Sequence, residues 1–324
     1  MSNDTDKTDR ARLVFEAAER LGWSDADEVA KFVRRLERGL PAEDEFSVVL
    51  RWLGQCRLVH KLDQFPYPPG VWSRYRVPDL LAVFEVDGQA VPALIEVKVN
   101  ADPVLSWKPA YLAALQRYAE LLRLPLLVAW KHGTIWVLFE ARHLRKAAKN
   151  LNISFGDALK ETLLGLLAGD FSFSFRPGVG LHLKIRKVKE HDDRSFEGKV
   201  EEAYLLNARG EKHKGGGGIL QLFTCIQQDV ELQEDETHVV QSFIVPANNS
   251  SEPAHRALVT LLEIFRGKEP LVWRHVLLKE QRPWLSVSPQ QAARNGLEAG
   301  FIQYVLQIEP TTPPSFIRPK ADGG

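Results

Sequence analysis

The sequence predicts an α/β domain followed by a strand-rich α+β domain. The first indication is a hairpin over residues 76–100, where two apolar runs flank the turn Val86-Asp87-Gly88-Gln89. Asp-Gly favours this assignment because it tolerates the positive φ angles of a tight hairpin turn. The second indication is a helical pattern on each side of the hairpin, and the third is a series of short strand patterns from residue 181 onward.

The composition is that of a globular protein with room for two domains, since the chain has 324 residues of which 44% are hydrophobic. Its 42 basic and 42 acidic residues cancel, so nucleic-acid binding would require a local basic surface. Two cysteines, Cys56 and Cys225, exclude a disulfide framework and a cysteine-rich zinc site, and they indicate a reducing cytoplasm. We find no signal peptide and no apolar run near the ~20 residues that span a bilayer, and we expect no membrane partner.

Regular elements are predicted on both sides of the hairpin. A helix is expected over Glu43–His60, where apolar residues recur at helical spacing, followed by a first strand in the extended stretch 59–69. Downstream, a helix is expected from Pro109 to Arg123, because proline suits the first turn of a helix. Two further strands are predicted at residues 124–130 and 134–140.

Charged side chains interrupt the two apolar arms of the hairpin. Glu96 and Lys98 are two residues apart, so in a strand both project from one face, while Asp79 opens the other arm. Burying these charges in a sheet is costly unless something compensates them. Two carboxylates on adjacent strands form a hard oxygen site of the kind that Mg²⁺ takes, with water and a substrate phosphate completing the coordination. We therefore expect a divalent metal at Asp79 and Glu96, beside Lys98.

The motif Pro78-Asp79, sixteen intervening residues, and Glu96-Val97-Lys98 resembles that of the PD-(D/E)xK nuclease superfamily. The resemblance implies a restriction-endonuclease-like αβββαβ core, a mixed sheet flanked by helices, and the predicted order of elements agrees with it. It also implies that Asp79, Glu96 and the Val97 carbonyl hold Mg²⁺, for which Mn²⁺ can substitute. Lys98 would serve the hydrolytic step.

Many members of this family direct a glutamate of the first helix and a glutamine of the second helix at the site. By resemblance, the matching residues here are Glu45, with Glu43 as the alternative, and Gln116.

A second interpretation of the motif involves no catalysis. Glu-x-Lys is common on solvated strands, and Pro-Asp is common in turns. Asp79, Glu96 and Lys98 could instead close into a salt-bridge cluster inside a nucleic-acid-binding or protein-interaction module that keeps the nuclease fold.

Basic residues in two stretches are candidates for nucleic-acid binding. Arg74 and Arg76 lie at the end of a proline- and aromatic-rich loop, residues 64–76, and can grip phosphates. A second set follows the last core strand at helical spacing: Arg142, Arg145, Lys146 and Lys149.

We expect three parts in the chain. They are an N-terminal helical extension (1–40), a nuclease-like domain (41–175) and a substrate-selecting or oligomerising α+β domain (176–324) with a disordered tail from Thr311. In the last domain, strands are predicted at residues 181–189, 200–208, 219–228 and 238–246, and helices are predicted from Pro253 to Phe265 and from Ser288 onward.

The sequence and the resemblance together predict a metal-dependent nuclease that acts on DNA in the cytoplasm. The resemblance implies a role in prokaryotic defence or restriction, or in DNA repair or recombination. A homodimer would let two such sites address two strands.

Overall fold

The computed structural model describes most of the chain between residues 42 and 317. The described ranges are 42–63, 74–192, 195–214, 217–223, 228–246, 255–256 and 287–317. They divide into two compact units. Unit 1 holds the described residues up to Ala168 and those from Glu309, and unit 2 holds those from Gly169 to Ile308. The predicted extension, residues 1–40, and most of the loop before Arg74 lie outside these ranges.

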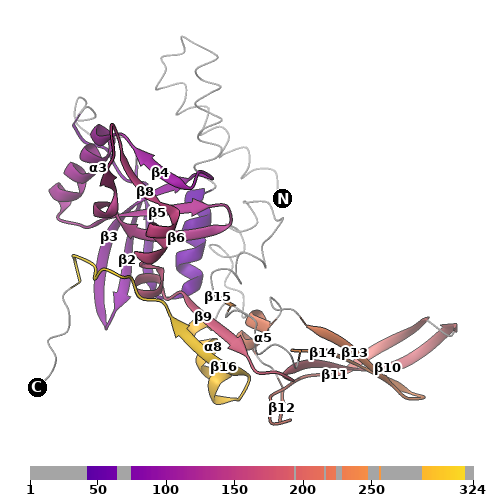
Figure 1. Cartoon of the computed structure of the whole chain (residues 1–324). Coiled ribbons are helices and arrows are strands. Elements are labelled where there is room, and N and C mark those ends of the chain that lie inside the picture. Colours follow the sequence, from indigo (N-terminus) through magenta and orange to yellow (C-terminus); the bar gives the residue numbers. More distant parts are fainter. Residues whose placement is uncertain are drawn as a thin grey trace, which may run out of the picture. The chain divides into compact units, whose positions relative to one another are not determined.

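A five-stranded mixed sheet forms the centre of unit 1 (Figure 1). The strand order is β1-β2-β3-β5-β6, in which β3 and β5 are parallel and the other neighbours are antiparallel. The strands are β1 (Cys56–Lys61), β2 (Leu80–Val86), β3 (Gln89–Val99), β5 (Leu126–His132) and β6 (Ile135–Glu140). The predicted α/β class with a mixed sheet is confirmed for this unit.

The predicted hairpin between β2 and β3 is confirmed at its turn. Val86 pairs with Gln89, and the two residues between them have φ angles of 52° at Asp87 and 80° at Gly88. Positive φ at both central residues is the requirement of a type I′ turn, which matches the twist of the flanking strands. The turn therefore fixes the register of β2 against β3, and with it the charged residues that meet.

Helices cover both faces of the sheet. A helix of residues 42–53 packs against one face, where the rings of Phe46 and Trp136 have centroids 4.8 Å apart. The predicted second helix is confirmed as α3 (Pro109–Leu122), whose Leu112 and Leu115 belong to one core cluster with Trp130. Trp130 on β5 pairs with Val137 on β6, the residue after Trp136. Successive residues of a strand point to opposite faces, so the two tryptophans project from opposite faces of the sheet.

The helix predicted over Glu43–His60 is wrong in its second half. It ends at residue 53, and Gly54 follows with a φ angle of 97°, a left-handed conformation that often ends helices. From Cys56 to Lys61 the chain instead pairs with β2. These sheet hydrogen bonds outweigh the local helical pattern, and the first strand begins earlier and ends earlier than predicted.

Unit 1 also contains a small three-stranded antiparallel sheet, called the side sheet here. It contains β4 (Val104–Trp107), β8 (Leu151–Ser154) and the short β7 (Arg145–Lys146), in the order β4-β8-β7. The helical stripe predicted over residues 142–149 is therefore wrong. A 3₁₀ turn, η2 (Ala141–His143), is followed by pairing of β7 with β8, so the four basic residues do not share a helical face.

After the side sheet, α4 (Phe155–Lys160) begins at Ser154, whose hydroxyl accepts a hydrogen bond from the Asp157 N–H. The π-helical segment η3 (Leu164–Ala168) follows and ends the first part of unit 1.

Unit 2 consists of two antiparallel sheets and two described helices. The three-stranded sheet has the order β15-β9-β16, and the five-stranded sheet has the order β12-β11-β10-β14-β13. The strands are β9 (Phe171–Phe175), β10 (Gly180–Asp192), β11 (Ser195–Leu206), β12 (Lys212–His213), β13 (Asp229–Glu234), β14 (His238–Ile244), β15 (His255–Arg256) and β16 (Ile302–Gln307). The helices are α5 (Gly217–Phe223) and α8 (Pro289–Glu298), and the second begins at Ser288 as predicted.

Two sequence predictions in unit 2 are wrong. Residues 219–228 were predicted as a strand, but α5 occupies their first part, because Ile219, Leu222 and Phe223 bury one helical face. The helix predicted from Pro253 is not present at His255–Arg256, which pair with β9, and the rest of it lies outside the described residues.

The predicted disordered tail is ordered as far as residue 317. Glu161 accepts hydrogen bonds from the N–H and hydroxyl of Thr312, both at 3.0 Å. Glu140 accepts the N–H of Ser315 at 2.9 Å and also its hydroxyl. These contacts hold residues 309–317 against unit 1. None of the described helices is both long and apolar enough to cross a bilayer.

Candidate functional site

The register of β2 against β3 brings Asp79 and Glu96 together. Leu80 pairs with Ile95, so Asp79 and Glu96 lie across from each other one residue beyond this pair. Residues that lie across from each other in a sheet project from the same face, and Lys98 lies two residues further along β3. All three charged side chains therefore lie on the face that α3 covers.

The two carboxylates make different contacts. Asp79 Oδ2 accepts a hydrogen bond from the Val97 N–H at 2.7 Å. Glu96 Oε1 receives the Nζ of Lys98 and the hydroxyl of Tyr111, which lies in the first turn of α3. Only 3% of the Glu96 side chain is exposed, yet its Oε2 has no hydrogen-bond partner among the described residues. A buried carboxylate oxygen without a partner is costly, and a cation or a water molecule would satisfy it.

Burial and the charge of Glu96 raise the pKa of Asp79 well above its usual value. Burial also raises the pKa of Glu43, at the start of the first helix, and the charge of Glu43 adds to the negative field at Asp79. Lys61 compensates part of this charge, with its Nζ 3.4 Å from Glu43 and 2.6 Å from Asp44.

Carboxylates outnumber ammonium groups in this cluster. The four acids are Asp79, Glu96, Glu43 and Asp44, and the two bases are Lys98 and Lys61. Burial lowers the pKa of Lys98, but the charges of Glu96 and Asp79 raise it more, so the net shift is upward and the ammonium stays protonated. With all four acids ionised the cluster would carry a surplus of two negative charges, which a divalent cation would balance.

The described residues fit a cation that keeps part of its water shell. Among them, no group of three acidic, histidine or cysteine side chains could hold a metal ion, so a cation here would take at most two carboxylates from the protein, Asp79 and Glu96. Mg²⁺ is commonly held by one or two carboxylates, with water and a substrate phosphate in the remaining positions. The unpartnered Oε2 of Glu96 is the oxygen best placed for such a role.

Glu45 is engaged on the other face of the sheet. Its carboxylate accepts hydrogen bonds from the Nζ of Lys131 at 2.6 Å and from the indole N–H of Trp136 at 2.9 Å. Both partners project toward the first helix, away from the face of Asp79. The structure therefore does not bring Glu45 to the cluster, and Glu43 is the glutamate of this helix whose charge reaches Asp79.

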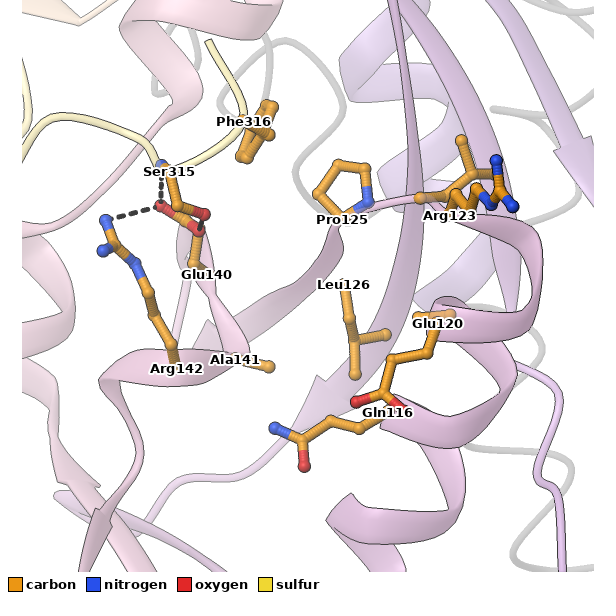
Figure 2. A pocket seen from close by; sticks show the side chains of 12 residues that line it. Gln116, Glu120, Arg123, Pro125, Leu126, Glu140, Ala141, Arg142, Ser315 and Phe316 are labelled. Atoms are coloured by element: carbon orange, nitrogen blue, oxygen red, sulfur yellow. Dashed lines mark hydrogen bonds and ion pairs between the residues drawn. The ribbon is translucent and has the colours of Figure 1, made fainter. Parts of the chain in front are cut away.

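Gln116 lines an open cavity of about 410 Å³ at the beginning of β5. Figure 2 shows Gln116 at this cavity beside Leu126, with Glu140 on the opposite wall. Leu126 pairs with Leu94, two residues before Glu96 on β3, which is about 7 Å along the strand. The structure therefore places Gln116 at this cavity, and among the described residues its side chain makes no hydrogen bond with the acidic cluster.

Tyr111 is the main member of the cluster that sequence reasoning missed. Its hydroxyl contacts Glu96, and its ring lies 5.3 Å from Lys98 Nζ and 5.2 Å from the Trp107 ring. The available signal was its position one turn before Leu115 on the inner face of α3, at the end of the helix nearest the motif.

Three arginines lie beside the cluster along α3. The guanidinium of Arg76 lies 4.4 Å from the centroid of the Tyr111 ring, and Arg117 Nε donates to the Arg74 carbonyl at 2.7 Å. Within the part of the chain that the structure describes, none of these three arginines pairs with a carboxylate. Arg117 was not among the predicted residues.

The four basic residues predicted after the last core strand differ in their contacts: one is paired with a carboxylate and three are not. Arg142 is neutralised by Glu140 at 2.8 Å and donates to the Pro313 carbonyl at 2.8 Å. The other three are exposed and have no carboxylate partner within the described ranges: Arg145, Lys146 and Lys149.

No protein-family model and no curated protein matches this chain. Among solved structures, a similar one is the Holliday junction resolvase Hjc of the archaeal hyperthermophile Archaeoglobus fulgidus. The match has 20% sequence identity and a TM-score of 0.30, and it covers 36% of this chain and 89% of that chain. A likeness of this extent establishes neither fold nor function, so the functional assignment depends on the geometry of the site.

Proposed function

We propose that this chain is a metal-dependent nuclease that hydrolyses phosphodiester bonds in DNA. The observation that carries the proposal is the pair of buried carboxylates, Asp79 and Glu96, on neighbouring strands beside Lys98. The order of elements supports it. The helix of residues 42–53, then β1, β2, β3, α3 and β5, follow one another as in a restriction-endonuclease-like αβββαβ core, with β4 inserted before α3.

Asp79 and Glu96 are the proposed ligands of Mg²⁺ or Mn²⁺, and the Val97 carbonyl is a third candidate. When bound, such an ion supplies positive charge to the scissile phosphate and lowers the pKa of an attacking water. The N–H of Val97 holds Asp79 in place through Oδ2. Lys98 and Tyr111 hold Glu96 through Oε1, which leaves Oε2 for the ligand role.

Lys98 is proposed to act as a cation rather than as a proton acceptor. The raised pKa of its ammonium in the acidic cluster supports this choice, because a general base must be deprotonated at the working pH. With 30% of its side chain exposed, Lys98 can reach solvent, where it would orient water and stabilise charge that develops on the phosphate.

Uncompensated cations support a polyanionic substrate. Around α3 and the side sheet several basic residues have no carboxylate partner among the described residues, and they include Arg74, Arg76, Arg117, Arg145, Lys146 and Lys149. Elsewhere on unit 1, several cations pair with acids: Arg57 with Glu85, Lys131 with Glu45, Arg142 with Glu140 and Lys160 with Asp157. The unpaired set is therefore the proposed DNA-facing surface, and Arg142 is left out of it.

A specific observation also favours the second candidate, a non-catalytic binding module. The ion pair of Lys98 with Glu96 is what an internal salt-bridge cluster would contain. However, Glu96 Oε2 has no hydrogen-bond partner within the described ranges, whereas a closed salt-bridge cluster would satisfy it. The biological role proposed for the nuclease is in prokaryotic defence or restriction, or in DNA repair or recombination.

The proposal is tested by incubating the full chain with supercoiled, linear, single-stranded and branched DNA, in Mg²⁺, in Mn²⁺ and in chelator. We expect cleavage of at least one DNA form with metal and none with chelator. Asp79→Asn should abolish it. Glu85→Gln is the matched control, because Glu85 lies on the same hairpin but pairs with Arg57 at the surface. Failure of the wild-type chain to cut any of these substrates with either metal would contradict the proposal.

A further inference from the structure

We propose that Tyr111 is a positioning residue of this site, which selects the Glu96 oxygen that binds metal and holds Lys98 beside it. This inference depends on the proposed nuclease function. The observation behind it is that one side chain contacts three of the charged groups around the site: Glu96, Lys98 and Arg76.

The hydroxyl of Tyr111 acts on Glu96. It donates to Oε1, the same oxygen that receives Lys98 Nζ, so both donors of the site hold one oxygen of the carboxylate. The carboxylate is thereby fixed about its terminal torsion, and Oε2 is left as the buried oxygen for which the described part of the chain supplies no partner. Hydrogen bonds of this kind orient metal ligands, and their removal typically weakens metal binding by 10- to 100-fold.

The ring of Tyr111 acts on the two cations. Lys98 Nζ lies 5.3 Å from the Tyr111 ring centroid and 5.8 Å from that of Trp107, so the ammonium has aromatic neighbours as well as Glu96. The guanidinium of Arg76 lies 4.4 Å from the Tyr111 ring. Because cations are attracted to aromatic faces, the ring links a proposed phosphate-binding arginine to the proposed catalytic lysine, Lys98.

The hydroxyl and the ring can be tested separately. Tyr111→Phe removes only the hydroxyl, whereas Tyr111→Leu removes the ring as well. Tyr118→Phe is the matched control: Tyr118 lies on the same helix, two turns further along, and its hydroxyl contacts no carboxylate in the described part of the chain. For each full-length variant, cleavage rates are measured against Mn²⁺ and DNA concentration, and melting curves are recorded in chelator.

For Tyr111→Phe we expect the Mn²⁺ concentration at half-maximal rate to rise by about 10- to 100-fold, with the maximal rate restored at saturating metal. Its melting temperature in chelator should lie only slightly below that of Tyr118→Phe, because Glu96 Oε1 keeps Lys98 as a donor. For Tyr111→Leu we expect a lower kcat that metal does not restore and a higher KM for DNA, because Lys98 and Arg76 lose their ring contact.

A Tyr111→Phe protein with the Mn²⁺ dependence of the wild type would overturn this inference while leaving the nuclease function intact. A loss of activity in Tyr111→Phe that saturating metal cannot restore, together with a lowered melting temperature, would show a purely structural role and would also overturn it. A wild-type chain that neither binds metal nor cuts DNA would instead refute the proposed function itself.

Discussion

At the scale of single residues, the buried acids of the proposed metal site lower the stability of the folded protein when no metal is bound. Asp79 is held by the Val97 N–H, but burial and the charge of Glu96 raise its pKa. A buried acid with a raised pKa stabilises the fold while it is protonated, and this stability is lost as the pH rises through its folded-state pKa. In the absence of metal, the ionised pair therefore weakens the protein at neutral pH.

Asp79→Asn should consequently stabilise the metal-free protein. The amide oxygen of asparagine can still accept from the Val97 N–H, and the buried charge is removed. The wild type and the variant should have similar free energies of unfolding near pH 4, where an aspartate of the unfolded chain titrates. As the pH rises, the variant should become more stable than the wild type, by about 1.4 kcal/mol for each unit by which the folded-state pKa of Asp79 is raised. Urea unfolding in chelator across pH measures this. A variant that is less stable than wild type at every pH would show that Asp79 is a structural ion-pair partner.

Lys98→Ala separates metal binding from turnover. We expect cleavage to fall by about 10²- to 10⁴-fold, as when a positioned proton donor or a charge stabiliser is removed. The variant should melt below wild type in chelator, because Glu96 loses its ion pair, and Mg²⁺ should recover most of this loss. If the cluster is a structural salt bridge instead, the free energy of unfolding of Lys98→Ala should fall by on the order of 3 to 5 kcal/mol. Adding Mg²⁺ should then restore none of this lost stability.

At the scale of elements, two neighbouring acids of one helix take different roles. Glu45 attaches the helix of residues 42–53 to the sheet through Lys131 and Trp136, whereas Glu43 adds its charge to the field at Asp79. Sequence reasoning could place both on a helix beside the sheet. It could not choose between them, because two residues differ by about 200° around a helix and the rotation of the helix on the sheet is fixed only by packing.

The unpaired arginines on and beside α3, Arg117, Arg74 and Arg76, predict where DNA binds. Arg74→Glu with Arg117→Glu should weaken DNA binding at all sequences and flatten its salt dependence, because each lost phosphate contact removes counterion release. Arg57→Glu with Lys160→Glu is the matched control, since both residues are paired with carboxylates at the surface of unit 1. DNA affinity is measured by fluorescence anisotropy over a salt series in chelator. Equal losses in the two double variants would mean that only overall charge matters.

At the scale of the whole molecule, the segment after β16 returns to unit 1 and satisfies two of its acids. Ending the chain after Pro310 removes the hydrogen bonds of Thr312 to Glu161 and of Ser315 to the buried Glu140. We expect a lower melting temperature, with a loss of about 0.5 to 1.5 kcal/mol in the free energy of unfolding for each hydrogen bond removed, because Glu140 keeps its ion pair with Arg142. Thr311→Ala is the control, because Thr311 donates its backbone N–H to the Lys160 carbonyl. The alanine variant keeps this hydrogen bond. An unchanged melting temperature in the truncated chain would show that this segment contributes no stability.

The elements predicted correctly from sequence are those specified by local chemistry. The Asp87-Gly88 turn, the Pro109 start of α3 and the Ser288 cap of α8 each depend on the conformational preference of one or two residues. The register of the hairpin follows from its turn, so the meeting of Asp79 with Glu96 could be predicted as well.

The errors concern features that depend on distant partners. The first helix gives way to β1 because β2 is available to pair, and residues 219–223 form a helix because that face is buried in unit 2. The order of residues 311–317 depends on Glu140 and Glu161, more than 150 residues earlier in the chain. Tyr111 was missed for the same reason, since only the packing of α3 on the sheet brings its hydroxyl to Glu96.

The central claim is that Asp79 and Glu96 form a divalent metal site, and calorimetric titration of Mn²⁺ into the full chain at neutral pH tests it most directly. We predict one saturable site in the wild type, its loss in Asp79→Asn, and its retention in Glu45→Gln, whose carboxylate lies on the other face of the sheet. Absence of Mn²⁺ binding in the wild type, or equal binding in wild type and Asp79→Asn, would contradict the account.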